Sequence, residues 1–573
     1  MLSQWIQTVL LQRVLILVIS LGLLIAGLVS YQQLRIDAFP EISPTQVKII
    51  LKAPGLPPEE LETRVTRKIE VELLGIPNQA MLRSVIKYGL TDITVDFAEG
   101  TDIYWARQQV AERLAGVWPE LPADIGGGIA PMSTPLGELF MLTLDGPQSL
   151  EEKRRVLDWQ IRPLLRTVPG VADVNALGGK VETWAVVPDM AALAAVDLTL
   201  DDLQEFLAEN NRNDGAGRLD DGEEAIIVSS TGRIRSLEDL ASRVLIWRDG
   251  MAVHLSDVAE VRLDSLTRYG GVTASQRAED GTINSGEAVE ALVVALKNAN
   301  AQQVISGVRE AMSTLESSLP PGMTLNVFYD RSNLIDRAVG TVTEALWIAV
   351  ALVILLLGLF IGNVRTALVV AVNLPMSALA TFVIMDAFDM SANLMSLGGL
   401  AIAIGMLVDG AVVVVENAVT RLQAASPKLP RLHVIFRAIH EVALPIISGT
   451  LIILLVFSPL VTLEGLEGKL FSPVALTIMF ALGSSLLVSL TLIPVLTSLL
   501  IRAEQVRTPG WVEAMQSAYR RSLANTLKRP APMLAGLAIA VVITLLAFMD
   551  TGKAFMPEMD EGDLIVQLEK IPT

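Results

Sequence analysis

Seven long apolar segments constrain the fold of this 573-residue chain more than any other feature of its sequence. A helix of about 20 apolar residues is long enough to cross the hydrocarbon core of a bilayer. Charged residues make up only 18% of the chain, and its mean hydropathy of +0.50 is too high for a single soluble domain. We therefore expect an α-helical polytopic membrane protein with about seven transmembrane helices. The expected spans are Val14–Val29, Ala345–Gly362, Ala367–Met385, Leu394–Val415, Val442–Leu463, Val474–Ile501 and Met533–Phe548.

The charges between the spans predict the orientation of the chain. Arginine and lysine are concentrated between the fourth and fifth spans and between the sixth and seventh, whereas the loops Asp386–Asp389 and Glu464–Glu467 are acidic. The positive-inside rule places the basic loops and the N-terminus in the cytosol. Arg13 precedes the first span and no small-residue cleavage site follows it, so we expect an uncleaved signal anchor. The segment from about 31 to 340 is then exported.

The exported segment carries nearly all of the net charge of −18, because it contains 46 acidic and 29 basic residues. An acidic surface repels nucleic acid and attracts cations, so we expect no nucleic-acid partner. A solvated acidic face that keeps the domain soluble explains the same charge. The chain contains no cysteine, which excludes disulfides and thiolate metal sites within it.

The exported segment has the pattern of a large α+β domain with an internal repeat. In the first unit we expect strands at Thr45–Ala53, Met81–Lys87 and Thr91–Phe97 and helices at Pro57–Leu74 and Asp102–Leu114. In the second we expect strands at Leu139–Leu144, Val171–Ala176 and Val181–Val187 and a helix at Ser149–Arg166. This order predicts βαβ subdomains of the split ferredoxin-like kind. Asn210–Gly217 is polar and contains two glycines, which is typical of a hairpin tip.

Asp409 and Glu416 lie in the fourth expected span. An ionised carboxylate at the centre of a spanning helix costs about 2.5–3.5 kcal/mol on insertion scales. The two are seven residues apart and so share one helical face, and Gly405 and Gly410 would let another helix approach Asp409. Burial would bring the carboxyl group's titration nearer to the working pH. We expect a proton or cation relay; a carboxylate that pairs with a lysine or arginine of another helix is the alternative.

Five motifs in series indicate a family resemblance. They are DAFPEISPTQVKI at 37–49, YDRS at 329–332, NLMSLGG at 393–399, GMLVDGAVVVVENA at 405–418 and FMPEMDEGD at 555–563. Together they make the chain similar to the resistance-nodulation-division (RND) efflux permeases, and most of all to the heavy-metal efflux subfamily. The resemblance covers essentially the whole chain.

The resemblance implies a homotrimeric proton/cation antiporter of the inner membrane of a Gram-negative bacterium. Its implied partners are a periplasmic adaptor, an outer-membrane channel and the membrane lipid. It implies a transporter rather than an enzyme, with no cofactor, a proton gradient as energy source and a metal cation as cargo. A hairpin carrying Asn211, Asp214, Gly215 and Gly217 would reach into the neighbouring protomer.

The resemblance also implies a division of the chain into domains. These are a first span (1–30), periplasmic porter subdomains (31–188), a docking subdomain inserted in the second of them (189–266), the remainder of that subdomain (267–340), spans two to six (341–502), a cytoplasmic amphipathic linker (503–531), a seventh span (532–550) and the start of a second periplasmic half (551–573). Family members are about twice as long. We therefore expect a truncated product or one part of a split pump, which needs a missing C-terminal half for transport.

The metal signature of the family is mixed in this chain. Zinc-type members usually carry an acid six residues before the relay aspartate, where this sequence has Ala403. Copper- and silver-type members use membrane methionines; Met395 matches one of these, but Leu407 and Leu482 occupy other expected positions. A lone methionine in a span is more often part of the core than a ligand.

Glu138 and Asp173 resemble acids that zinc-type pumps place at their periplasmic site. Carboxylate oxygens hold divalent cations, although transition metals usually recruit histidine as well. A plain surface carboxylate is the alternative for each acid. The three histidines have no metal-ligand partner at a recognisable spacing and are interpreted as structural or solvated: His254, His433 and His440. We expect the cargo to be a divalent cation rather than copper or silver.

Three other functions are alternatives for a chain with these features. An intramembrane aspartyl protease usually has one catalytic aspartate in a Gly-x-Gly-Asp turn, which Leu407-Val408-Asp409 does not supply. An RND pump for hydrophobic organic compounds favours two adjacent aspartates and a phenylalanine-rich pocket, whereas Gly410 follows Asp409 here and aromatics are only 5%. The third alternative is an inactive half-pump that serves as a membrane scaffold, and the sequence does not exclude it.

Overall fold

The computed structural model describes residues 2–221, 224–248, 250–268, 270–277, 281–361, 363–426, 429–501 and 510–552. The motif FMPEMDEGD lies outside these residues, and so does most of the expected second periplasmic half. The chain forms two compact units. One contains residues 1–139, 295–306 and 330–573, and the other contains residues 140–294 and 307–329.

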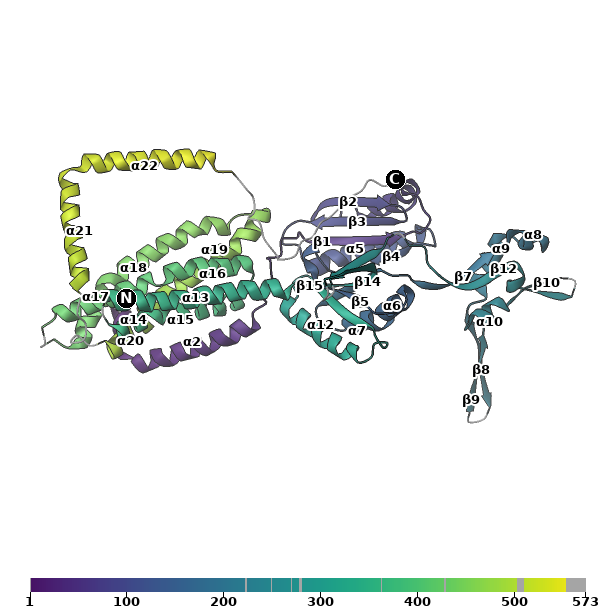
Figure 1. Ribbon diagram of the computed structural model, residues 1–573, viewed down its shortest axis with the longest axis horizontal. Coiled ribbons are helices and arrows are strands. Elements are labelled where there is room, and N and C mark those ends of the chain that lie inside the picture. Colours follow the sequence, from purple (N-terminus) through teal and green to yellow (C-terminus); the bar gives the residue numbers. More distant parts are fainter. Residues whose placement is uncertain are drawn as a thin grey trace. The chain divides into compact units, whose positions relative to one another are not determined.

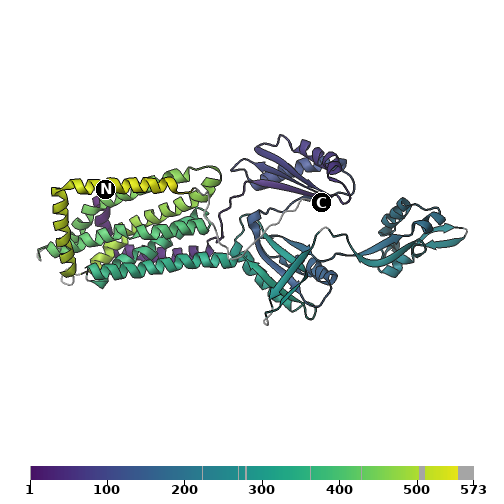
Figure 2. The same cartoon turned by 45° about the horizontal axis from the view of Figure 1, so that its top comes forward.

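The first unit contains the long apolar helices, and those before residue 501 run side by side in Figures 1 and 2. Among the described residues, seven helical segments are long and apolar enough to cross a membrane. They are α2 (Arg13–Gln33), α13 (Ser332–Ile361), α14 with α15 (Val364–Ala371, Asn373–Ala387), α16 with α17 (Leu394–Leu407, Asp409–Ala424), α18 (Arg431–Val461), α19 with α20 (Gly465–Leu490, Leu492–Leu500) and α22 (Pro530–Asp550). Two more helices, α1 (Leu2–Leu11) and α21 (Gly510–Lys528), complete this set.

Three of the seven segments are interrupted, at Val372, Val408 and Thr491. The first and third interruptions have a cause in the sequence. Pro375 and Pro494 each follow the break by three residues, and a proline has no N–H for the carbonyl four residues before it. The break at Val408 has no proline, so its cause lies in the packing around it.

The helices α15 and α19 form the centre of the bundle. Both are largely buried, and α19 packs against α15, α16 and α18. Small residues set the closest approaches: a Cβ on Gly399 of α16 would lie 2.7 Å from the Val474 carbonyl oxygen of α19. A Cβ on Gly27 of α2 would lie 2.6 Å from the Leu379 Cβ of α15. Close approach at small residues is a common way for helices to associate inside a membrane, because the hydrophobic effect does not drive helices together there.

The first unit also contains a four-stranded antiparallel sheet in the order β2-β3-β1-β4. Its strands are β1 (Gln46–Lys52), β2 (Gln79–Lys87), β3 (Leu90–Phe97) and β4 (Gly126–Ile129). Two helical segments pack on it: one runs from α3 (Pro58–Leu61) through a π-helical turn to α4 (Arg67–Leu73), and the other is α5 (Ile103–Val117). Alternate residues of β1 are buried, and Asp102 caps α5 by accepting the Trp105 N–H at 2.8 Å. The strand order is that of a split βαβ subdomain.

The second unit repeats this order around a longer strand. Its strands are β5 (Glu138–Asp145), β6 (Val171–Gly178), β13 (Val272–Arg277), β14 (Ile283–Ala295) and β15 (Thr324–Asp330). They form the path β13-β14-β5-β15, and β6 pairs with β14. The connecting helices are α6 with α7 (Leu150–Val156, Arg162–Leu165) and α12 (Ala301–Glu316).

The expected strand Val181–Val187 exists, but the prediction that it belongs to this repeat is wrong. It is β7 (Glu182–Pro188), and within the described residues it pairs only with β12 (Ala259–Ser265), in a separate two-stranded ribbon. The ribbon leads into an insertion with its own small core, which contains Leu193, Leu203 and Leu255. Alternation along β7 marks a strand but does not identify its partner.

The insertion carries an arm of two antiparallel strands, β8 (Asn213–Asp221) and β9 (Glu224–Thr231), which extends away from the small helices in Figure 1. The expected tip at Asn210–Gly217 is instead the base of this arm, because the register pairs Asp221 with Glu224 at the far end. The two glycines flank a register shift, and Gly217 has φ +108°, so they form a β-bulge rather than a turn.

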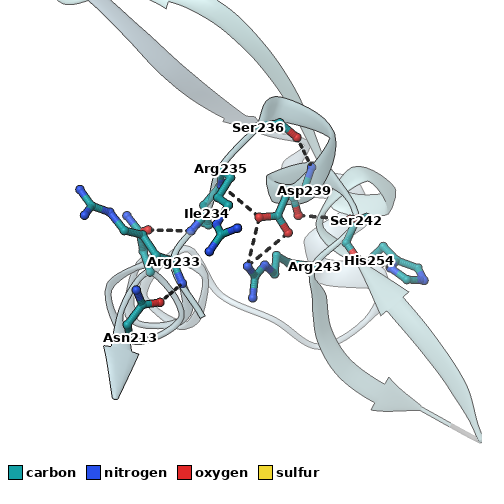
Figure 3. A network of polar contacts seen from close by, with 10 residues as sticks. Asn213, Arg233, Ile234, Arg235, Ser236, Asp239, Ser242, Arg243 and His254 are labelled. Atoms are coloured by element: carbon teal, nitrogen blue, oxygen red, sulfur yellow. Dashed lines mark hydrogen bonds and ion pairs between the residues drawn. The ribbon is translucent and has the colours of Figure 1, made fainter. Parts of the chain in front are cut away.

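Polar contacts fix the base of the arm to the insertion (Figure 3). The side-chain oxygen of Asn213 accepts the Arg233 N–H at 3.0 Å, and that of Asn211 accepts the Ile234 N–H at 3.2 Å. His254 Nδ1 lies 2.8 Å from the Ser242 carbonyl oxygen, which agrees with a structural role for this histidine. The arm is therefore held at its base and exposed along its length.

Candidate transport sites

The break between α16 and α17 places Asp409 at the first residue of α17. At this break the Leu407 carbonyl oxygen accepts hydrogen bonds from Asn373 Nδ2 at 2.5 Å and from Ser485 Oγ at 2.6 Å. The two donors also contact each other at 2.8 Å. Side chains that bond a carbonyl in this way interrupt the helical hydrogen-bond ladder. Asn373 and Ser485 therefore account for the break that no proline explains.

Asp409 is the central residue of the candidate span Leu394–Ala424. As their spacing predicts, Asp409 and Glu416 lie on the same face of α17, and both side chains are exposed among the described residues. Ile402 and Val413 continue this exposed stripe, at 58% and 42% exposure. The expectation that Asp409 is buried does not hold within the described residues.

The glycines near Asp409 differ in their surroundings. A Cβ on Gly410 would meet Ser489 Oγ of α19 at 3.4 Å and Ile446 of α18 at 3.5 Å, which is ordinary contact. A Cβ on Gly405 would meet nothing within 4 Å. Gly410 thus lies against the bundle, whereas Gly405 lies on its open side with Asp409.

A line of buried polar residues runs beside this site. We call it the polar seam; its members are Asn373, Ser377 and Thr381 of α15 and Ser484, Ser485 and Ser489 of α19. The hydroxyl groups of Ser484 and Ser489 have no hydrogen-bond partner among the described residues. Sequence reasoning missed the seam, although an asparagine in the third span and three serines in the sixth were visible signals.

A cavity of about 210 Å³ lies where two of the recognised motifs, at 37–49 and 329–332, meet. The Arg331 guanidinium, in the YDRS motif, lies 5.7 Å above the Phe39 ring and donates a hydrogen bond to the Leu136 carbonyl oxygen. In the same cavity Arg35 pairs with Asp389 at 2.8 Å. Burial raises the pKa of Asp37 above its usual value, against the weaker lowering effects of a backbone hydrogen bond from Ala301 and of nearby arginines.

The three metal candidates are not brought together by the structure into one group. Glu138 begins β5 and is exposed, and Met395 lies in the first turn of α16 with its N–H bonded to the Asn393 side chain. Asp173 lies in β6 and pairs with Arg162 at 3.1 Å and with Arg166 at 3.5 Å. Among the described residues no group of three or more histidine or acidic side chains could hold a metal ion.

The sequence profile of the AcrB/AcrD/AcrF family matches residues 5–573 of the chain. The cobalt-zinc-cadmium resistance protein CzcA of Cupriavidus metallidurans is 35% identical over 98% of this chain and 53% of that protein. The cation efflux system protein CusA of Escherichia coli K12 is 33% identical over 98% of this chain and 54% of that protein. The chain thus spans about half the length of the curated relatives it matches.

Solved structures show the same likeness. The crystal structure of a heavy metal efflux pump superimposes with a TM-score of 0.80 and 31% identity over 95% of this chain and 52% of that protein. The resemblance inferred from the five motifs is confirmed: the chain belongs to the AcrB/AcrD/AcrF family of RND efflux permeases.

Proposed function

We propose that this chain carries the proton relay and the porter subdomains of a proton-driven efflux permease for heavy-metal cations. The observation that supports this most is the position of Asp409. It is the central residue of a candidate span, at a helix break held by Asn373 and Ser485, on an uncovered face shared with Glu416. A charge at this depth is costly unless it has a function.

Asp409 acts as the proton carrier in this proposal. Protonation neutralises its carboxylate and removes a cost of about 2.5–3.5 kcal/mol at the bilayer centre, so loaded and unloaded states favour different surroundings. The break at Val408 provides a point at which α16 and α17 can change their relative direction. Glu416, two turns nearer the basic loop, passes the proton between Asp409 and the cytosol.

We further propose that another half of the permease covers the exposed stripe of α17. The stripe presents two carboxylates, and α22 has no buried residue among those described. The stripe of α17 and the surface of α22 are surfaces that a membrane protein normally packs against other helices. The seven apolar segments cross the inner membrane, with the basic loops in the cytosol and the two sheets and the insertion in the periplasm.

The arm β8–β9 docks into a neighbouring protomer of a homotrimer. An isolated two-stranded hairpin is marginally stable in water, and this one exposes Leu219, Ile226 and Ile227. A partner surface would cover these side chains. The assembled permease works with a periplasmic adaptor and an outer-membrane channel, as tripartite RND pumps do.

The favoured cargo is a divalent cation. Leu407 and Leu482 occupy positions of the methionine ladder and are buried in the hydrophobic core. Copper and silver are therefore less favoured as cargo. Glu138 is exposed and free to act as an oxygen ligand. Asp173 binds metal only after it releases Arg162 and Arg166, so a cation that displaces these two ion pairs is required.

Growth of a pump-deleted strain tests this function. The strain expresses the chain together with its complementary half and is challenged with zinc, cobalt, nickel, cadmium, copper, silver and a lipophilic dye. We expect protection against divalent cations. Protection against the dye and against none of the metals would overturn the metal function, and it would favour a pump for organic compounds.

A further inference from the structure

A groove of about 600 Å³ lies at the end of the bundle where α17 ends and α18 begins, away from the relay and metal residues. Helix α1 contributes Ser3, α17 contributes Arg421, and α18 contributes His433, Arg437 and His440. Helices α1 and α17 both pack against α18, so the groove is formed by three helices rather than by one loop.

The charges in this groove are unevenly neutralised. Arg421 binds Glu441 through two hydrogen bonds, at 2.6 and 3.1 Å, and Asn417 also contacts Glu441. Arg437 has no hydrogen bond or ion pair within the described part of the chain and interacts with Glu441 only at longer range. Arg437 and the imidazoles of His433 and His440 therefore face an open groove. Its one acid, Glu441, is already paired with Arg421.

The same face of α18 becomes apolar one turn further along. His433, Arg437 and His440 are separated by four and three residues, and all three are exposed. At the same helical angle Leu444, Leu451 and Leu455 follow, with exposures of 65%, 55% and 74%. The stripe thus has a basic end of about two turns and an apolar end of more than three turns.

We propose that this stripe binds one anionic phospholipid. The phosphate group lies in the groove against Arg437 and His440, and an acyl chain lies along Leu444, Leu451 and Leu455. Basic pockets between membrane helices at the cytoplasmic side bind anionic headgroups in this way. A free anion would leave the apolar end of the stripe unused, and a zwitterionic lipid would leave the charge of Arg437 without a net counter-charge.

The positive-inside rule alone also places arginines at this end of the bundle, but it predicts no preferred position among them. Arg520 on α21 provides the matched control, because it is exposed, equally charged and outside the groove. Arg437→Gln and Arg520→Gln make the same change in net charge. Only the first removes a groove residue.

The test is native mass spectrometry of the purified chain in detergent, titrated with phosphatidylglycerol or phosphatidylcholine of matched acyl chains. We expect one phosphatidylglycerol to bind preferentially, and Arg437→Gln to weaken it about fivefold, since a basic residue near the headgroup contributes about 1 kcal/mol. Arg520→Gln should leave it unchanged. Leu451→Asn should weaken lipid binding without changing binding of glycerol 3-phosphate.

Three results would overturn the site. Equal binding of both lipids would show that the charge plays no part. Equal effects of Arg437→Gln and Arg520→Gln would show general attraction to the basic end. Competition by glycerol 3-phosphate at an affinity equal to that of the lipid would identify a site for a free anion. The variants change exposed side chains, and thermal unfolding checks that each remains folded.

Discussion

Gly399 tests the packing of the bundle through a single added methyl group. A Cβ on Gly399 would lie 2.7 Å from the Val474 carbonyl oxygen and 3.1 Å from its Cα. The obstructing atoms belong to backbone rather than to a flexible side chain, so α16 and α19 would have to move apart by several tenths of an ångström. Close-packed interiors resist such a change, and overpacking of this kind costs about 1–3 kcal/mol.

Gly398 is the matched control, because a Cβ there would meet nothing within 4 Å. Gly398→Ala should stabilise α16 by up to about 1 kcal/mol through helix propensity alone. The free energy of unfolding of both variants is measured by titrating the detergent-solubilised chain with sodium dodecyl sulfate and following helicity by circular dichroism. We expect Gly399→Ala to be less stable than Gly398→Ala by about 1–3 kcal/mol, because both variants gain the same helix propensity and only Gly399→Ala has the overpacking cost. Equal stability of the two variants would refute the close approach of α16 to α19.

Three further predictions concern buried or paired polar groups. Asn373→Leu should lower the free energy of unfolding by about 1–3 kcal/mol, because the Leu407 carbonyl oxygen loses a buried donor; the same titration measures it, and a neutral effect would contradict the role of Asn373 in the break. Burial raises the pKa of Asp37 above its ordinary value of 3.8, so the unfolded chain loses this proton first, and stability falls as the pH rises from 3.8 through the raised pKa. Asp37→Asn should reduce that fall in thermal unfolding at pH 4 and pH 7, and an unchanged pH dependence would argue against it. Arg162→Gln should raise the affinity for Zn²⁺ in calorimetry if Asp173 is a ligand, because it removes a competing cation, and unchanged affinity would leave Asp173 a purely structural residue.

The sequence was sufficient to predict features that depend on local pattern. The apolar segments, the strands β1, β2, β3, β5 and β6 and the shared face of Asp409 and Glu416 follow from hydrophobic periodicity and helical spacing. The breaks before Pro375 and Pro494 were predictable for the same reason, since proline removes a hydrogen bond of its own helix.

Features that depend on contacts between distant segments were not predictable in this way. The break at Val408 is caused by side chains from two other helices, Asn373 and Ser485. Strand β7 alternates as any strand does, and only the fold shows that it pairs with β12. The glycines at this position fit the pattern of a turn as well as that of a bulge, because each of these structures favours a glycine at positive φ, as Gly217 has here.

The ion pairs of Asp173 are a further example. Neither arginine is at a spacing that predicts a contact, because one lies on α7 and the other just after it, while Asp173 is on the adjacent strand β6. The arrangement of helix and strand brings the three together. An acid assigned to a metal site by its motif is thereby found with two cationic partners.

The central claim is that a proton on Asp409 is exchanged for the metal cation during transport. Proton flux across the membrane of proteoliposomes that contain the assembled permease, followed with an internal pH-sensitive dye after Zn²⁺ is added, measures this directly. The account predicts zinc-driven proton flux for the unmodified permease, a partial loss for Glu416→Gln and no zinc-driven flux for Asp409→Asn at the same reconstituted level. Full zinc-driven proton flux in the Asp409→Asn permease would contradict the account.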